Sequence, residues 1–261
     1  MFVAPAADPP SQPVIAGRFV LERLLGAGNM GDVFLALDRE TGQRVALKVL
    51  KPADAPPEID RFIREAQLLT ELRHPNIVAH VAHGVDVARG PYLAMELLEG
   101  EDLRQHLCRG RLSVGDTVAL LHGVAAALAE VHRFGVVHRD LKPSNLFLRH
   151  GEPRNVVLLD FGIARRALRG GALTRTGAIV GTPEYMAPEQ ARGARGIGPP
   201  TDVFALGCVI HECLTGQPVF HGEHIAAVLV KILFEGPAPL ERADVPDALA
   251  ELLHRMLAKD P

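Results

Sequence analysis

The stretch "VVHRDLKPSNLFL", Val136–Leu148, places a dense group of polar side chains between two short aliphatic runs. Polar groups at this density are costly to place near a protein core unless each of them has a partner. The aliphatic runs predict a short strand on either side, so the polar group lies in the loop between them. The stretch therefore raises the question of which chemistry needs Asp140, Lys142 and Asn145 in one loop.

Length and composition narrow the range of functions. The 261 residues are enough for one large domain or for two lobes around a cleft. The net charge of −3 gives no reason to expect nucleic acid or a membrane surface as a partner. No apolar run approaches the ~18 residues of a membrane span, and the N-terminus lacks the pattern of a signal peptide. Without metal spacing, the cysteines Cys108, Cys208 and Cys213 are expected to be reduced, buried thiols in a reducing compartment.

The first part of the chain predicts a small sheet. Residues 1–17, rich in Pro and Ala, are expected to form a disordered tail. Residues 18–97 hold short runs rich in Val, Leu and Phe, which predict strands: "RFVLERLL", "DVFLALD", "RVALKVL", "IVAHVAHGVD" and "PYLAMELLE". Between them, residues 58–72 switch to a helical period of apolar residues and predict one main helix.

Residues 98–261 are mainly helical in pattern. Ser113 is expected to cap a helix that ends near Arg133, with one side formed by Val118, Leu121, Ala125 and Leu128. Thr201 is expected to cap a second, apolar helix that Gly216 closes. The remaining segments are predicted as short strand pairs around 136–161, a loop over 162–200 and helices over 223–235 and 246–258. A linker near 96–100 separates the two lobes, and a cleft between lobes is a natural place for a site.

The segment "GAGNMGDV" places Gly26, Gly28 and Gly31 between two predicted strands, with Val33 two residues later. One interpretation is a plain hairpin. The other is a flexible flap whose backbone amides approach phosphates closely, because no Cβ intervenes. A dinucleotide-binding fold is disfavoured, since it needs a helix directly after the last glycine and "DVFLALD" is strand-like.

Two charged residues interrupt apolar strands. Lys48 lies in "VALKVL" and is either an edge lysine that points to solvent or an inward lysine that needs an anion, for which Glu65 is the best candidate. Asp160 ends the apolar run "NVVLLD" and begins "DFG". It is either a turn residue or, together with Asn145 across a predicted hairpin, an oxygen ligand of Mg²⁺.

These motifs occur in the order and spacing of the protein kinase signature, and the chain resembles that family from about residue 18 to residue 261. The similar segments are Gly26–Val33, Val45–Lys48, His138–Asn145, Asp160–Gly162 and Ala187–Glu189. "HRDLKPSN" and "GTPEYMAPE" are similar to serine/threonine kinases, and "EYMAPEQ" with short loops resembles the bacterial Hanks-type members. The resemblance implies an α+β, bilobal fold with a small antiparallel N-lobe sheet and one main helix over 18–97, and a larger, mainly helical C-lobe over 98–261.

The resemblance also implies an activity: transfer of the γ-phosphate of ATP, with Mg²⁺, to Ser and Thr hydroxyls of proteins. Asp140 would accept or orient the hydroxyl proton, and Lys142 would meet the γ-phosphate. Lys48, fixed by Glu65, would meet the α- and β-phosphates. Thr182 would contact both Asp140 and Lys142. The metal ligands implied are Asn145 and Asp160.

The nucleotide site implied by the resemblance is assembled from both lobes. The glycine-rich loop would cover the phosphates with Gly26, Ala27, Gly28 and Gly31. The adenine would lie between Val33, Ala46 and Phe147, beside the gatekeeper Met95, with Glu96 and Leu98 offering backbone groups and Asp102 near the ribose. Asp202 would bond the backbone of the catalytic loop, and His138 would pack beneath it. His80 falls where the family has an apolar or aromatic residue of the spine that joins the lobes.

The resemblance suggests regulation by phosphorylation. Thr174 and Thr176 occupy positions where bacterial relatives autophosphorylate, and a phosphate there could pair with Arg139. A kinase-domain dimer would serve that reaction. The domain is expected in the cytoplasm, while the full-length protein could be anchored in a membrane beyond residue 261. In the family, Glu189 pairs with an Arg shortly after the end of this chain, so we expect a domain truncated at its C-terminal end unless Arg192 or Arg195 substitutes.

Two other classes remain open. A pseudokinase would bind without turnover, although Lys48, Asp140, Asn145 and Asp160 are all present. A small-molecule phosphotransferase of related fold would share the catalytic Asp and Asn but lack "GTPEYMAPE".

Overall fold

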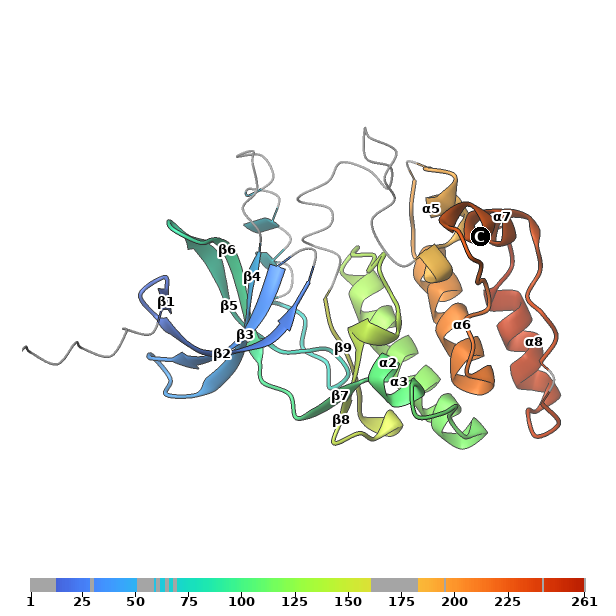
Figure 1. Cartoon of the computed structure of the whole chain (residues 1–261), viewed down its shortest axis with the longest axis horizontal. Coiled ribbons are helices and arrows are strands. Elements are labelled where there is room, and N and C mark those ends of the chain that lie inside the picture. Colours follow the sequence, from blue (N-terminus) through green and yellow to red (C-terminus); the bar gives the residue numbers. More distant parts are fainter. Residues whose placement is uncertain are drawn as a thin grey trace, which may run out of the picture. The chain divides into compact units, whose positions relative to one another are not determined.

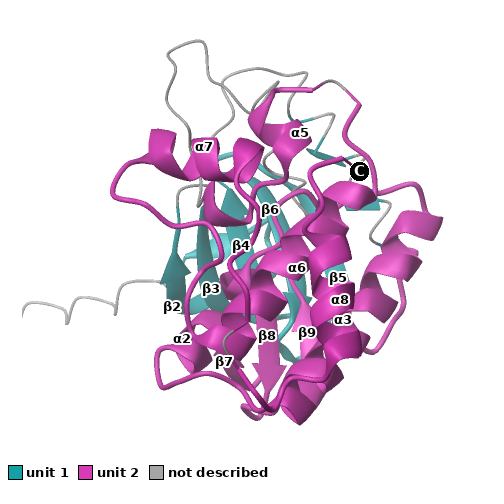
Figure 2. Cartoon of the chain, turned by 90° about the vertical axis from the view of Figure 1, so that its right-hand side faces the viewer, with its two compact units in different colours: residues 1–70, 80–97 teal, residues 71–79, 98–261 magenta. Residues whose placement is uncertain are grey.

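The structure is a computed structural model, and it describes residues 13–28, 31–50, 59, 62–63, 66–67, 70–160, 183–194, 196–240 and 242–260. The chain forms two compact units (Figure 2). Unit 1 contains residues 1–70 and 80–97, and unit 2 contains residues 71–79 and 98–261. Each unit has its own secondary structure and is described by itself.

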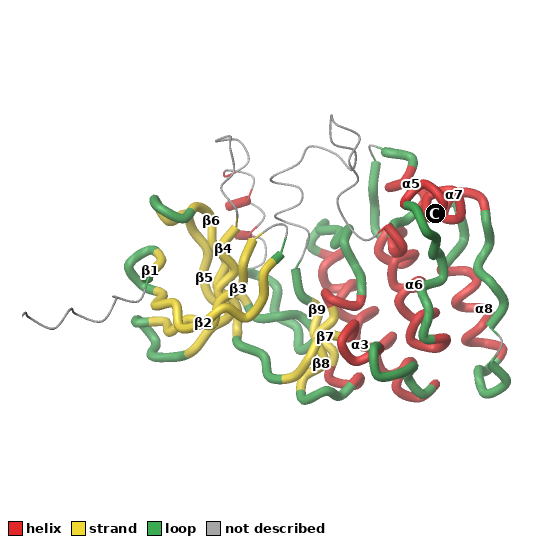
Figure 3. The backbone as a smooth tube through the Cα atoms, in the orientation of Figure 1, coloured by secondary structure: helices red, strands yellow, loops and turns green. Residues whose placement is uncertain are grey.

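Unit 1 contains an antiparallel six-stranded sheet in the order β1-β2-β3-β4-β6-β5 (Figures 1 and 3). Its strands are β1 Val14–Ile15, β2 Phe19–Ala27, β3 Gly31–Asp38, β4 Arg44–Leu50, β5 His80–Asp86 and β6 Gly90–Glu96. The predicted strand runs are thus confirmed. The described residues between 59 and 67 are helical, with Phe62 and Ala66 buried, whereas Glu65 lies outside the described residues.

The expected tail over 1–17 is wrong for its last residues. Val14 and Ile15 pair with Val20 and Phe19, and the Ile15 side chain is fully buried. Ala16 and Gly17 both have positive φ, 50° and 68°, and the Arg18 amide donates to the Ile15 carbonyl at 3.0 Å, so these two residues form the centre of a tight turn between β1 and β2. Residues 1–12 lie outside the described residues.

The register of the sheet assigns its side chains to two faces. One face carries the apolar core of the unit: Ile15, Phe19, Leu21, Ala36, Val45, Leu47, Tyr92 and Ala94. The opposite face carries two cross-strand rows, because directly paired residues share a face. One row runs Val33, Lys48, Leu93, His83, and the other runs Leu35, Ala46, Met95, His80. The polar members of these two rows are Lys48, His80 and His83.

An ion pair fixes the start of the sheet. The guanidinium of Arg18 donates from Nε and Nη2 to the two carboxylate oxygens of Asp38, both at 2.7 Å. Asp38 is fully buried and also accepts from the Glu40 amide and the Thr41 hydroxyl. The hydrogen bonds from Arg18 hold the pKa of Asp38 well below its usual range.

Replacing Arg18 with Met is expected to destabilise the protein by about 2–3 kcal/mol at pH 7. The cost is below the roughly 3–5 kcal/mol of a fully buried pair because the Arg18 side chain is 24% exposed. A carboxylate with a depressed pKa stabilises the fold above its unfolded pKa near 4, and this contribution is lost as the pH falls below that value. The difference in unfolding free energy between Arg18→Met and wild type, measured with urea, should therefore be smaller at pH 3 than at pH 7. The exposed Arg23→Met variant is the matched control, and an unchanged difference at both pH values would contradict the assignment.

Unit 2 combines a small sheet with several helices. The strands β7 Gly100–Asp102, β8 Leu146–Arg149 and β9 Val156–Leu158 form an antiparallel sheet in that order. The helices are α2 Leu103–Leu107, α3 Val114–Arg133, α5 Pro188–Ala191, α6 Pro200–Thr215, α7 Ile225–Phe234 and α8 Asp247–Met256. The predicted helices over 223–235 and 246–258 are confirmed with shorter ends.

Helix α3 begins as predicted, with the Ser113 hydroxyl accepting from the Asp116 amide. Its buried side is rotated from the expected one: Val118 is 45% exposed, and the residues that pack inward are Leu120, Val124, Ala127, Leu128 and Val131. By length and composition this helix could cross a membrane, a property not anticipated from the sequence. It packs against α6 and β9 within unit 2, as the core helix of a folded domain does.

Three further expectations about unit 2 need correction. Helix α6 begins at Pro200, so Thr201 is not its cap; the Thr201 hydroxyl bonds Glu189 instead, and only Gly216, in the left-handed region with φ 80°, acts as expected. Residues 136–142 form no strand, because their backbone groups bond side chains rather than a neighbouring strand. Cys108 is exposed, while Cys208 and Cys213 are buried.

Candidate active site

The loop before β8 is held by a buried carboxylate. Asp202, near the start of α6, is fully buried and accepts from the backbone amides of His138 and Arg139, both at 2.8 Å. The His132 ring on α3 bonds the same carboxylate at 2.7 Å. Arg139 has a φ of 66°, which is strained for a residue with a side chain. Asp202 thus stabilises a conformation that the loop would not adopt alone. The resemblance to protein kinases implied this bond between Asp202 and the loop backbone.

Asp140, Lys142 and Asn145 lie together at this loop. The Lys142 ammonium is 2.9 Å from Asp140 Oδ2, and both side chains remain partly exposed. Asn145 donates from Nδ2 to the Asp140 backbone oxygen at 2.7 Å. Since its amide nitrogen is used inside the loop, its Oδ1 atom is left to accept from or coordinate another group. The three groups named from the sequence therefore form one cluster.

Asp160 follows β9, and the backbone connects it to the same cluster. The Leu159 amide donates to the Asn145 carbonyl at 2.9 Å, and the His138 ring bonds the Leu159 carbonyl at 2.8 Å. His138 is fully buried, which agrees with a packing role beneath the loop. Asp160 has a φ of 48°, so its side chain stands on a strained backbone of the kind found at functional sites.

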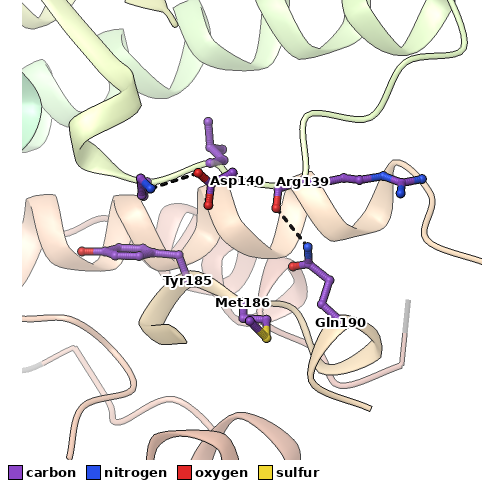
Figure 4. A pocket seen from close by; sticks show the side chains of 7 residues that line it. Arg139, Asp140, Tyr185, Met186 and Gln190 are labelled. Carbon is purple, nitrogen blue, oxygen red and sulfur yellow. Dashed lines mark hydrogen bonds and ion pairs between the residues drawn. The ribbon is translucent and has the colours of Figure 1, made fainter. Parts of the chain in front are cut away.

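A hollow opens beside Asp140 and Lys142, and Figure 4 shows Tyr185, Met186 and Gln190 on its other side. Gln190 joins the two sides: its Nε2 donates to the Arg139 carbonyl at 3.0 Å, and its Oε1 accepts from the Ala187 amide at 3.0 Å. Asp140 is one of the residues that line this hollow.

Sequence reasoning did not identify Gln190, Tyr185 or Glu212 as parts of this region. The Tyr185 hydroxyl donates to Glu212 Oε2 on α6 at 2.6 Å. Burial raises the pKa of both groups, most strongly that of Tyr185. The segment "EYMAPEQ" contains Tyr185 and Gln190. Their hydrogen-bond partners, Glu212 and Arg139 respectively, are remote in the sequence, so the spacing of residues could not predict these bonds.

In unit 1, four predicted residues lie on the sheet face opposite the apolar core: Val33, Ala46, Lys48 and Met95. Lys48 on β4 is 8% exposed, so it is an inward lysine rather than an edge lysine. Val33 and Lys48 are direct partners, and so are Ala46 and Met95. Glu96, the last residue of β6, is partly buried. Lys48 therefore lies on the same sheet face as its direct strand partners Val33 and Leu93.

The glycine-rich segment is a hairpin between β2 and β3, with the Gly28 amide donating to the Gly31 carbonyl at 3.0 Å. Gly31 is required by packing, because a Cβ there would lie 2.3 Å from the Val49 carbonyl oxygen. Gly26 has nothing within 4 Å of the position that a Cβ would take. A hairpin backbone is compatible with both interpretations of the segment. Packing explains the glycine at position 31 but not the one at position 26.

The remaining predicted residues divide into those placed and those not described. Phe147 pairs with Asp102 across β7 and β8, and Asp102 caps α2 by accepting from the Gln105 amide at 2.8 Å. Leu98 is partly buried at the start of the second segment of unit 2. Outside the described residues lie Glu65, Phe161, Gly162, Thr174, Thr176, Thr182 and Arg195.

Glu189 is partly buried, and its carboxylate accepts a hydrogen bond from the Thr201 hydroxyl. This hydrogen bond does not test whether the domain is truncated, so that stays a prediction.

Curated proteins similar to this chain are bacterial kinases. The chain is 39% identical over 254 residues to serine/threonine-protein kinase PknA of Mycobacterium tuberculosis strain H37Rv, covering 95% of this chain and 58% of PknA. It is 41% identical over 261 residues to Pkn1 of Myxococcus xanthus, covering 98% of this chain and 37% of that protein. For PknB of Mycolicibacterium smegmatis the identity is 38%, over 95% of this chain and 40% of PknB. The chain thus spans about half the length, or less, of these relatives.

A family profile covers nearly the whole chain: residues 19–261 match the protein kinase domain. The expected bilobal α+β fold is confirmed by this match, and the separate sheet and helical units agree with it. The clustered Asp140, Lys142 and Asn145 occupy the matched region, as do Lys48 and Asp160. The chain belongs to the protein kinase family.

Proposed function

We propose that this chain is an active protein serine/threonine kinase domain that transfers the γ-phosphate of ATP to Ser and Thr hydroxyls of proteins in bacterial signalling. The observation that carries the proposal is the cluster in unit 2, where the Asp140 carboxylate, the Lys142 ammonium and the Asn145 side-chain amide lie together beside a hollow. All the named relatives are serine/threonine-protein kinases.

The cluster suits phosphoryl transfer because that reaction requires positioning and charge neutralisation more than covalent chemistry. A substrate hydroxyl in the hollow would donate a hydrogen bond to the Asp140 carboxylate, which would take the proton as the new oxygen–phosphorus bond forms, the bond from the γ-phosphorus to the bridging oxygen breaks and ADP leaves. Lys142 stands 2.9 Å from Asp140 Oδ2 and would stabilise negative charge on the transferred group. Gln190 holds the Arg139 carbonyl and thereby fixes the residue that precedes the catalytic carboxylate.

The residues present fit a magnesium ion. Asn145 commits its amide nitrogen to the Asp140 carbonyl and keeps Oδ1 available, and Asp160 supplies a carboxylate, which are the hard oxygen donors that Mg²⁺ takes. Bound Mg²⁺ neutralises phosphate charge. Asn145 is 7% exposed and so is held in a single orientation by its surroundings, ready to offer that oxygen.

The sheet face of unit 1 fits a nucleotide. Val33, Ala46 and Met95 offer apolar surface for a base, and Lys48 offers an ammonium for phosphates. The proposal assigns the backbone of Glu96 and Leu98 to the adenine edge, with Phe147 and Asp102 completing the base and ribose contacts. Gly26, Ala27, Gly28 and Gly31 are assigned to the phosphates. Glu65 and Thr182, outside the described residues, keep their expected roles as partners of Lys48 and of the catalytic cluster.

The glycine-rich hairpin offers a matched pair of substitutions. Gly26→Ala is expected to leave the thermal midpoint within about 1 °C of wild type, because its added methyl group meets nothing in the protein. The same methyl group is expected to weaken ATP binding about tenfold, because it keeps the phosphates from approaching the backbone closely. Gly31→Ala is expected to lower the midpoint by several degrees, because its Cβ would collide with the Val49 carbonyl. Calorimetric unfolding and titration with a fluorescent ATP analogue separate the two effects. Equal ATP affinity in Gly26→Ala and wild type would remove Gly26 from the phosphate site.

One assay distinguishes the proposed function from the two alternatives. The purified chain is incubated with γ-labelled ATP and Mg²⁺, together with a generic protein substrate or with aminoglycosides. A protein kinase labels Ser and Thr of the protein substrate, and a small-molecule phosphotransferase labels only the aminoglycoside. A pseudokinase binds the ATP analogue and labels neither, which would overturn the proposal.

We also assign to this domain the finer properties that the resemblance implies. These are protein substrates bearing Ser or Thr, a cytoplasmic location where ATP is available, and autophosphorylation at Thr174 or Thr176 within a kinase-domain dimer. Arg139 supports the last of these, since it precedes the catalytic Asp140 and could pair with a phosphate. Mass spectrometry of the same incubation would show phosphate on one or both threonines.

A further inference from the structure

Two histidines lie side by side on the edge strand of unit 1. His80 Nε2 and His83 Nδ1 are 2.9 Å apart, and the ring centroids are 5.0 Å apart with the planes at 61°. Both residues are half-buried. The sequence did not predict a contact between the two rings, because residues three apart on a regular strand point to opposite faces.

A β-bulge explains how the rings meet. His80 pairs with Met95 and Ala82 pairs with Ala94, so Val81 is an extra residue on β5. After this insertion His83 pairs with Leu93, and the two histidines stand opposite residues that are only two apart on β6. The bulge therefore turns both rings to one face of the sheet, which is how bulges re-aim side chains at functional positions.

We propose that His80 and His83 form a binding site for a borderline divalent cation, Zn²⁺ or Cu²⁺. Two nitrogens that each lie 2.0–2.1 Å from one ion are about 2.8–3.4 Å apart for ligand angles between 90° and tetrahedral. The observed separation of 2.9 Å is within that range, so both nitrogens can bind one ion once the hydrogen bond between them breaks and each lone pair turns toward the ion. Each ring stays neutral and carries its proton on its other nitrogen, so no proton is left unaccounted for. Water fills the remaining positions, and imidazole ligands favour Cu²⁺ over Zn²⁺ at equal concentration.

Imidazole binds a metal in its neutral form. On β6, the facing residues Leu93 and Met95 are apolar. Among the described strand residues in these two rows, the charged group is Lys48, which pairs with Leu93 from the next strand. Two strand spacings, about 10 Å, separate Lys48 from His83, a distance at which salt screens most of the repulsion.

The site is distinct from the proposed magnesium site, because Asn145 and Asp160 belong to the other unit and offer oxygen ligands. It also does not depend on the proposed kinase activity. Its test uses the whole chain without nucleotide or Mg²⁺.

Titration calorimetry with CuCl₂ and ZnCl₂ in a non-coordinating buffer tests the site. Wild type should bind one ion that His80→Asn and His83→Asn each bind at least about tenfold more weakly, since even an outer partner of a metal ligand is worth 10–100-fold in affinity. The control is the double variant His221→Asn/His224→Asn, which removes two exposed histidines three residues apart and should keep the ion. Wild-type affinity in either single variant overturns the proposal.

A second measurement keeps the test decisive if a variant folds poorly. In the wild-type chain, Zn²⁺ should shift the ring ¹⁵N signals of His80 and His83 in nuclear magnetic resonance spectra and leave those of the exposed His221 and His224 in place. Shifts confined to other histidines would overturn the site. Zn²⁺ should also raise the thermal midpoint of wild type and of the control variant, because an ion that binds only the folded state stabilises it.

Discussion

Replacing Asp140 with Asn is expected to lower kcat for phosphorylation of a protein substrate by about 10²- to 10⁴-fold, the usual worth of a positioned general base. The substitution keeps the size and shape of the side chain but removes the carboxylate that Lys142 approaches at 2.9 Å. Asp140 is only partly buried, with its side chain 16% exposed, so the fold should survive the change. The thermal midpoint should stay within a few degrees of wild type, and the affinity for the ATP analogue should change little.

The measurement is the initial rate of ³²P incorporation with the variant and wild type at equal folded concentration. Glu223→Gln is the matched control, since it also neutralises a carboxylate but lies exposed between α6 and α7. A rate for Asp140→Asn within about twofold of wild type would show that the substrate hydroxyl does not use this carboxylate. An inactive wild type would instead contradict the proposed kinase function itself.

Much of the fold could be predicted because its local signals are strong. Ser113 and Gly216 mark helix ends by capping chemistry that operates within a few residues, and both act as predicted. Thr201 carried the same signal and was assigned wrongly, because Pro199 and Pro200 start the helix earlier and the hydroxyl finds Glu189. The residue type indicates that a side chain can cap a helix, and tertiary contacts decide whether it does so.

The functional cluster could also be predicted from the sequence, because its residues are close together in the chain. Asp140, Lys142 and Asn145 lie within six residues, so any compact loop brings them together. The contact between His80 and His83 could not be predicted from the sequence, because it depends on a β-bulge at Val81 that the residue pattern does not indicate. Gln190 and Tyr185 bond partners 51 and 27 residues away, and such long-range contacts follow from packing rather than spacing.

The second large effect is expected at Asp202, which contacts no substrate in the proposed reaction. Replacing it with Asn should destabilise the protein by about 3–5 kcal/mol, the usual cost of breaking a buried charged network. The carboxylate is fully buried and accepts from two backbone amides and the His132 ring. An Asn amide offers one oxygen acceptor and an NH₂ group that can only donate. At least one buried donor therefore loses its acceptor and faces another donor, a loss of about 1–3 kcal/mol for each.

Asp202→Asn should also reduce kcat by roughly 10²-fold in the fraction that remains folded, since a shift of about 1 Å at a catalytic group can cost that much. The reason is that Arg139, with its φ of 66°, relaxes once its amide loses the carboxylate, and Asp140 is the next residue. Denaturant unfolding gives the stability, and rates corrected for the folded fraction give the turnover. Asp247→Asn, at the exposed start of α8, is the control for loss of one carboxylate. If Asp202→Asn lost stability but kept its corrected rate, the strained loop would be held by Gln190 and the Asn145 amide alone, and Asp202 would serve only the fold.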